Sequence, residues 1–125
     1  MVNQVFCFVE HTLSVIGGKW KAVILWHLCQ ENKGYRYGEI KQLLPKINHK
    51  ILSQQLKELH SDELITRVQF NSMPPKVEYK ISKKGETLLP ILELMHHWGN
   101  LDLQEKPSTS SQKIKEKIVI KNNKS

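Results

Sequence analysis

The sequence predicts one α+β domain in which helices precede a β-hairpin and a further helix closes the chain. Apolar residues recur every three or four positions up to residue 59, which is the spacing of one helix face. Between residues 64 and 81 they alternate with polar residues, which is the spacing of one strand face. With 125 residues, 39% hydrophobic and 25% charged, the chain is long enough to bury the core of a single soluble domain.

The first two helices are predicted at residues 5–16 and 19–28. Gly17 and Gly18 separate them, because glycine is costly inside a helix and well suited to a turn. Apolar side chains surround most of the axis of the second helix. That helix is therefore expected to be the central, buried one.

A helix-turn-helix is predicted next. Its first helix covers about residues 37–44, with Ile40, Leu43 and Leu44 facing the core, and its second follows Asn48 and reaches about residue 59. The side-chain oxygen of Asn48 can cap that second helix by accepting a hydrogen bond from an amide one turn further on. By its position, the second helix is the recognition element.

The two faces of the Asn48 helix differ in chemistry. Leucines at three- and four-residue spacing form the inner face. The outer face has no carboxylate before Glu58 and carries cationic, amide and hydroxyl side chains: His49, Lys50, Ser53, Gln54 and Lys57. Such groups suit phosphates and base edges in a DNA major groove. On an isolated helix the same pattern more often marks a solvated face, so the interpretation depends on the remaining elements.

A hairpin follows, with strands predicted at 64–70 and 77–81 and a stiff, basic turn that contains two prolines and Lys76. A helix-turn-helix followed by a hairpin wing is a winged helix, an architecture that presents its second helix to the major groove. Double-stranded DNA with two half-sites is therefore the expected partner. The predicted DNA-contacting residues are Asn48, His49, Lys50, Ser53, Gln54, Lys57, Lys76, Arg36 and Lys46.

Ser82 is predicted to cap one long final helix that reaches about Gln104, with a kink at Pro90. Its apolar residues form two stripes, which is more apolar surface than a small core needs. Together with the apolar first helix, they predict a homodimer; a single larger core that absorbs both stripes is the alternative. The expected interface residues are Phe6, Val9, Leu94, Trp98 and Leu101.

The net charge of +7 is unevenly distributed. Residues 106–125 hold six lysines and one glutamate, whereas residues 1–105 hold 13 basic and 11 acidic side chains. We expect 1–105 to be the winged-helix domain, with the first helix and residues 83–104 forming the dimer interface, and 106–125 to be a disordered basic tail. The charge of the whole chain is therefore weak evidence for nucleic-acid binding.

Several function classes are not expected. No apolar run approaches the ~18 residues of a membrane span, and no secretory signal is present, so a cytoplasmic protein with free thiols is predicted. The sequence contains no glycine-rich phosphate loop, nucleophile elbow or clustered carboxylate pair, which argues against an enzyme. The six histidines lack the spacing of a helical zinc pair, so neither a metal nor another cofactor is expected.

Five motifs in order resemble the HxlR family of bacterial transcriptional regulators, relatives of the MarR type. They are C-x5-L-x2-I-G-G-K-W-K from Cys7, Y-x-E-I-K-Q-L-L-P-K-I from Tyr37, L-x3-L-K-E-L from Leu52, P-P-K-V-E-Y from Pro74 and P-I-L-x-L-M-x2-W-G from Pro90. The resemblance covers about residues 5–103. It implies a dimeric winged-helix repressor or activator paired through its first and last helices. Several members respond to electrophiles or oxidants through a cysteine near the N-terminus.

Cys7 is accordingly the candidate sensor, with a small electrophile or oxidant as its partner. Near the start of a helix, amide dipoles and nearby lysines would favour the thiolate; the alternative is an apolar thiol buried between Phe6 and Phe8. Cys29, at the end of the second helix, is expected to be structural. The competing function is a winged-helix module for protein–protein contact, which the cationic face of the Asn48 helix disfavours.

One residue departs from the family pattern. Glu63 stands before the hairpin where the family usually has glycine. A left-handed backbone there would cost about 1 kcal/mol with a side chain present, so the preceding helix is expected to end differently.

Overall fold

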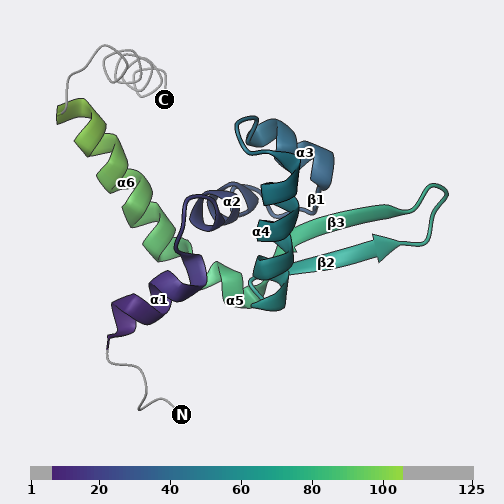
Figure 1. The fold of residues 1–125 in the computed structure, drawn as a ribbon, viewed down its shortest axis with the longest axis horizontal. Helices are drawn as coiled ribbons and strands as arrows, with labels where there is room; N and C mark the ends of the chain where they lie inside the picture. The colour runs from purple at the N-terminus through teal and green to yellow at the C-terminus, as the bar shows by residue number, and fades with distance from the viewer. Residues whose placement is uncertain (1–6, 106–125) are drawn as a thin grey trace. The chain divides into compact units, whose positions relative to one another are not determined.

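The computed structural model describes residues 7–105, and the first and last residues of the chain lie outside that range. The chain divides into two units, which meet between Leu89 and Pro90. Within residues 7–105, the first unit contains five helices and a small sheet, and the second contains one long helix (Figure 1). The expected α+β winged-helix architecture is confirmed.

The first two helices are α1, Phe8–Ile16, and α2, Lys21–Leu28. Gly18 adopts the left-handed backbone with φ of 85°, and a side chain at Gly17 would collide with the carbonyl oxygen of Leu13. Both glycines are therefore needed for the turn, as the sequence indicated. The predicted start of α1 at residue 5, together with Phe6, lies outside the described residues.

The core of the first unit is centred on α2, α4 (His49–Ser61) and the base of the hairpin. The fully buried side chains are Ile24, Leu25, Leu28, Ile40, Ile47, Leu52, Leu56, Leu59, Leu64 and Ile65. This confirms that α2 is central, although Trp20, Val23 and Trp26 on its other sides are only partly buried.

The inward assignment of Leu43 was wrong, because 43% of its surface is exposed. Helix α3 spans only Tyr37–Leu43. Leu44 follows as the C-cap with φ of −127° and ψ of 66°, so it leaves the helical path and is buried. Ile40 and Leu44 therefore fill the core, and Leu43 stays on the outer side of α3.

The hairpin is present, with β2 at Ile65–Phe70 and β3 at Lys76–Ile81. The strands are antiparallel, and Figure 1 shows them projecting away from the helices of the first unit. A short strand β1, Tyr35–Arg36, pairs with the other edge of β3 and gives the order β1-β3-β2. Sequence reasoning missed β1, since two residues are too few to show an alternating pattern.

The final helix is divided in two, which corrects the single kinked helix that was predicted. Ser82 caps the short α5, Lys83–Glu86, by accepting from the Gly85 amide at 2.9 Å, and α6 then runs from Leu89 to Glu105. Pro90 lies in the first turn of α6, where its missing N–H would have no helical partner. Proline is tolerated in the first turn of a helix but not in its interior, so α6 begins as a helix separate from α5. No described helix is long and apolar enough to cross a bilayer.

Helix α4 ends in the left-handed conformation that was expected to be avoided. Glu63 has φ of 62°. The amide of Glu63 donates to the His60 carbonyl at 3.0 Å, and the amide of Leu64 donates to the Leu59 carbonyl at 2.9 Å. These two bonds form a Schellman motif, and burial of Leu59 and Leu64 supplies its hydrophobic contact. The motif therefore holds Glu63 in a backbone that favours glycine.

Replacing Glu63 with glycine is expected to raise the free energy of unfolding by about 1 kcal/mol, because glycine has no Cβ to penalise the left-handed backbone. Urea unfolding of the two proteins measures the difference. Glu63→Ala is the matched control, since it removes the same carboxylate and keeps the Cβ. Equal stabilisation by alanine would show that the carboxylate, and not the backbone, is responsible.

Candidate nucleic-acid interface

The orientation of α4 is fixed at its start and along its inner face. The Asn48 side chain accepts from the Ile51 amide at 2.8 Å, which confirms the predicted N-cap. Leu52, Leu56 and Leu59 are almost completely buried, which confirms the predicted inner face. The cap sets where the helix begins, and the leucines set which side faces outward.

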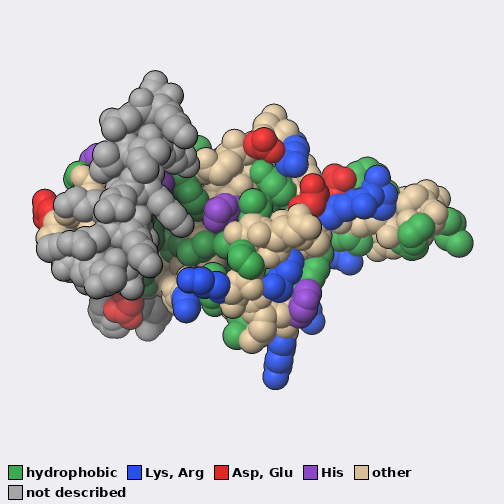
Figure 2. Space-filling model, turned by 90° about the horizontal axis from the view of Figure 1, so that it is seen from above, with side chains coloured by type: hydrophobic (Ala, Val, Ile, Leu, Met, Phe, Trp, Pro, Cys, Tyr) green, Lys and Arg blue, Asp and Glu red, His purple; other side chains and the backbone are tan. Residues whose placement is uncertain are grey.

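The five side chains predicted for the outer face, His49, Lys50, Ser53, Gln54 and Lys57, are all exposed. Lys50, Gln54 and Lys57 follow one another at helical spacing along the middle of this face, while His49 and Ser53 lie on its flank. Figure 2 shows Lys, Arg and His side chains along the lower edge of the molecule in that view, over α4 and the start of the hairpin. Within residues 7–105, neither Lys50 nor Lys57 forms an ion pair, so both cations are available to a ligand.

Tyr37, at the start of α3, holds the flank of this face. Its hydroxyl lies 2.9 Å from Nδ1 of His49 and donates to the His49 carbonyl at 3.2 Å, and the two rings stack with centroids 5.7 Å apart. The Ser53 hydroxyl donates to the Tyr37 hydroxyl oxygen at 3.5 Å. Sequence reasoning did not include Tyr37, because its distance of twelve residues from His49 has no helical or strand periodicity.

Glu58, the one carboxylate within α4, is bound on both sides. Its Oε1 pairs with Nζ of Lys21 in α2 at 2.7 Å, and its Oε2 accepts from Nε2 of Gln54 at 2.7 Å. The hydrogen bonds from Lys21 and then Gln54 lower the pKa of Glu58, so it stays ionised at neutral pH. Lys21 offsets its charge, and the acid therefore does not make the outer face anionic.

A hollow of about 440 Å³ lies between α4 and the hairpin. Its lining carries three basic side chains and three hydroxyls: Lys57, His60, Arg67, Ser53, Tyr37 and Tyr79. No carboxylate lines it, and within the described chain Arg67 forms no ion pair. The hollow therefore extends the cationic surface of α4 onto the wing. Sequence reasoning missed Arg67, since alternation assigns it to a strand face without showing what that face meets.

The other predicted contact residues are more dispersed. Lys76 is exposed at the start of β3, with Nζ 5.8 Å from the centre of the Phe70 ring. Lys46 is exposed in the turn between α3 and α4. Arg36 lies in the edge strand β1 and is the N-cap residue of α3, where its amide donates to Oε1 of Glu39 at 2.8 Å. The structure thus gathers Ser53 and Lys57 at the hollow, with His49 bonded to its lining residue Tyr37, and leaves Lys76 and Arg36 outside the lining.

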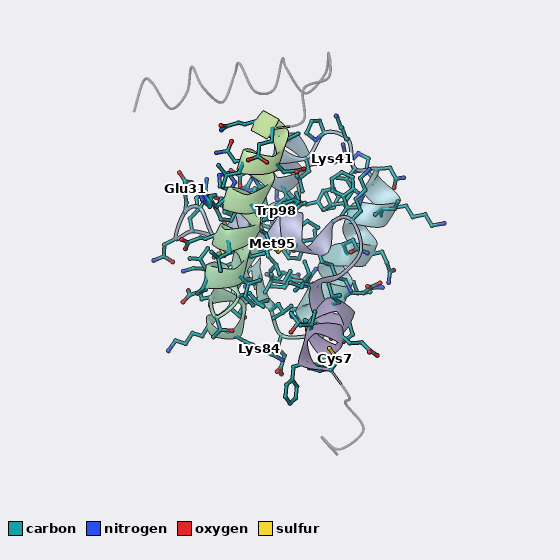
Figure 3. The ribbon with its side chains drawn as sticks, turned by 90° about the vertical axis from the view of Figure 1, so that its left-hand side faces the viewer. Cys7, Glu31, Lys41, Lys84, Met95 and Trp98 are labelled. Atoms are coloured by element: carbon teal, nitrogen blue, oxygen red, sulfur yellow. The ribbon has the colours of Figure 1, made fainter. Side chains whose placement is uncertain are left out.

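The predicted sensor and dimer residues are exposed where they are described. Cys7 is the exposed N-cap of α1 (Figure 3), so the alternative of a buried thiol is wrong. Val9 in α1 is exposed, and in α6 so are Leu94 at 70%, Trp98 at 67% and Leu101. By contrast, partial burial and then the charge of Glu86 raise the pKa of the Cys29 thiol. Cys7 is therefore the more accessible of the two thiols.

The part of the chain that the structure describes holds no group of three or more His, Cys, Asp or Glu side chains placed to bind a metal ion. The expectation of no metal rests, as before, on the spacing of the histidines.

The chain matches a known protein family and several known proteins in sequence. Residues 15–107 match a family model described as HxlR-like helix-turn-helix. The chain is 56% identical over 97 residues to the MalR protein of Fusobacterium mortiferum, which is described as regulatory, covering 78% of this chain and 91% of that protein. It is 52% identical over 91 residues to the HTH-type transcriptional regulator YtcD of Bacillus subtilis, covering 73% of this chain and 71% of that protein.

Solved structures agree with these relatives. The redox regulator HypR in its oxidised form is 37% identical, with a TM-score of 0.71, and covers 82% of this chain and all of its own. The reduced form of the regulator YodB from Bacillus subtilis is 30% identical, with a TM-score of 0.65, covering 77% of this chain and 93% of that one. YtcD and YodB are described as transcriptional regulators and HypR as a redox regulator, in agreement with the expectation that the chain is a regulator and not an enzyme.

Proposed function

Because the chain is a transcriptional regulator that belongs to the HxlR-like helix-turn-helix family, we propose that it binds operator DNA as a homodimer with α4 in the major groove. The observation that carries the proposal is the outer face of α4. Lys50, Gln54 and Lys57 are aligned and exposed there, both lysines lack an ion pair within the described chain, and Lys21 neutralises the nearby acid.

In this proposal the side chains divide by chemistry. Gln54 and His49 contact base edges, because an amide and an imidazole have directional donors and acceptors that distinguish base pairs. Lys50, Lys57 and wing Lys76 contact phosphates, since an ammonium group offers charge without sequence information. The remaining predicted residues contact the same DNA backbone from positions around the recognition helix. They are Asn48, Ser53, Arg36 and Lys46.

The homodimer is proposed from exposed apolar surface. Phe8, Val9 and Leu13 stand out from α1, and Leu94, Trp98 and Leu101 from α6. Figure 3 labels Met95 and Trp98 on neighbouring turns of α6, and Met95 is exposed as well. Monomeric proteins rarely expose this much apolar surface, so a second copy of the chain is the proposed cover. The functional unit is residues 1–105, with 106–125 as a basic extension, in a cytoplasmic protein.

The alternative is a winged helix used for protein–protein contact. A salt titration of binding to random duplex DNA separates the two. A DNA-binding chain should lose affinity steeply as salt rises, because each neutralised phosphate releases counterions. A protein-interaction module should show negligible affinity for the duplex at every salt concentration.

A second candidate activity is sensing through Cys7. The favouring observation is that Cys7 is exposed at the start of α1, one of the two proposed dimer helices. HypR, which is similar to this chain, is described as a redox regulator. Another similar structure is that of diamide-treated YodB. Addition of the Cys7 sulfur to a quinone or aldehyde carbon would place new bulk beside the dimer seam. Recognition helices must stay about 34 Å apart to meet half-sites one turn apart, so a small rotation of the protomers would weaken binding.

Replacing Lys76 with alanine is expected to weaken binding to all duplex sequences alike and to make the slope of log affinity against log salt shallower by about one unit. The reason is the loss of one phosphate contact without loss of base readout. Fluorescence anisotropy across a salt series measures the slope. Lys33→Ala is the matched control, because Lys33 lies in the loop between α2 and β1 and pairs with Glu31 and Glu39. An equal change in both variants would remove Lys76 from the interface.

Replacing Leu94 with lysine is expected to reduce self-association, since a charge would be buried in the proposed apolar seam. The unaltered chain should sediment as a dimer at micromolar concentration, and Leu94→Lys should sediment largely as a monomer. The control is Glu93→Lys, which introduces the same side chain at the adjacent exposed position. A monomeric mass for the unaltered chain would refute the homodimer.

Treatment with a quinone is expected to lower operator affinity of the unaltered chain at least tenfold, which requires only about 1.4 kcal/mol of difference between the two states. Cys7→Ser should resist the treatment, whereas Cys29→Ser should respond like the unaltered chain. Titrations of DNA binding before and after treatment measure both. If affinity is unchanged, or if Cys7→Ser is weakened equally, Cys7 is not the sensor.

A further inference from the structure

Lys21, Glu58 and Gln54 form a chain of contacts that runs from the buried helix α2 to the outer face of α4. Lys21 and Gln54 bind different oxygens of the Glu58 carboxylate, each at 2.7 Å. The Lys21 side chain is only 13% exposed, so its ammonium is held against α4 by the surrounding protein. The exposed carboxamide of Gln54 is therefore tied, through one acid, to the core of the first unit.

A carboxylate determines which way round the carboxamide lies. Ionised Glu58 can only accept hydrogen bonds, so it binds the nitrogen of Gln54 and repels the oxygen. The NH₂ group has two hydrogens, and Glu58 takes one of them. Gln54 is left with Oε1 as an acceptor and one N–H as a donor.

That pair of groups matches one base in the major groove. Adenine presents the N6 amino group as a donor beside N7 as an acceptor, and glutamine binds both at once. Guanine presents two acceptors, O6 and N7, at the same edge. A carboxamide that cannot rotate to offer both hydrogens bonds only one of them and places its oxygen against the other.

We propose that Glu58 and Lys21 are positioning residues that hold Gln54 ready for bidentate recognition of one adenine in each half-site. This rests on the proposed function, in which α4 enters the major groove. Without Glu58, an exposed glutamine would sample several rotamers and both amide orientations, and would lose conformational freedom on binding. Glu58 removes that freedom before DNA arrives.

A purely structural role gives a different expectation. The Lys21–Glu58 pair alone would join α2 to α4, and its loss would then weaken binding to every sequence alike. The proposed role affects one base position. Base preference at single positions therefore distinguishes the two.

The experiment starts from the duplex that the unaltered chain selects from a random pool. Each base pair is then changed in turn, and relative affinities are measured by competition. One A·T pair per half-site should be preferred by about 5- to 150-fold over the other pairs. Gln54→Ala should abolish that preference. Glu58→Gln should reduce it at least severalfold, because a neutral amide can donate as well as accept and lets Gln54 rotate.

The controls test position and coupling. Gln55→Ala, the adjacent glutamine without a bond to Glu58, should leave the preference intact. In a Gln54→Ala background, Glu58→Gln should cause no further change at that base pair, since the two act as one unit. Lys21→Met should lower the preference in the same direction as Glu58→Gln. Thermal unfolding of each variant shows that the chain is folded in the assay.

The inference is overturned if Glu58→Gln leaves the preference unchanged, if its effect is uniform across all positions, or if the position read by Gln54 is not an A·T pair. An unaltered chain that binds no duplex would refute the proposed function itself. The two failures are therefore distinguishable by whether the unaltered chain binds DNA.

Discussion

The rotation of α4 about its own axis is the constraint on which the rest of the structure depends. Leu52, Leu56 and Leu59 are buried, and each contributes about 1.5–3 kcal/mol by leaving water. Turning the helix to present another side would expose leucines and bury ammonium groups, which is far more costly than any single surface contact. Three leucines at helical spacing therefore decide which side chains face outward, and Lys50, Gln54 and Lys57 follow.

The surrounding elements stabilise that orientation from different directions. Asn48 fixes the start of the helix, and the Schellman motif around Glu63 fixes its end. Tyr37 holds His49 from α3, and Lys21 holds Glu58 from α2. A helix that is bonded at both ends and on both flanks presents its outer side chains in a defined arrangement. This is what distinguishes a surface able to read a sequence from one that merely attracts phosphate.

Features that depend on local periodicity could be predicted from the sequence. The helices, the break at Gly17 and Gly18, the Asn48 cap and the hairpin all follow from spacing or from the preference of one residue. Errors arose where two local rules competed. Leu43 fits the apolar period of α3, yet Leu44 fills the inward place because the helix ends there. Proline is disfavoured in a helix interior but favoured in a first turn. Pro90 occupies the first turn of α6, so α5 and α6 are separate helices.

The parts of the interface that could not be predicted are contacts between distant segments. Nothing in the spacing of Tyr37 and His49, or of Lys21 and Glu58, shows that they meet. Arg67 faces the hollow beside α4 only because β2 packs against that helix. Glu63 is the opposite case. The cost of a left-handed backbone at a non-glycine residue was assessed correctly, but two hydrogen bonds and two buried leucines outweighed that cost. Local chemistry predicted the elements, and tertiary packing determined the detailed site.

Selection of duplexes from a random pool, followed by hydroxyl-radical footprinting of the enriched sequence, tests the central claim most directly. If a homodimer presents α4 to DNA, the enriched sequence should be an inverted repeat. Its two half-sites should be protected on one face of the duplex, with centres about 10 base pairs apart. Failure to enrich any sequence, or uniform protection without two half-sites, would contradict the account.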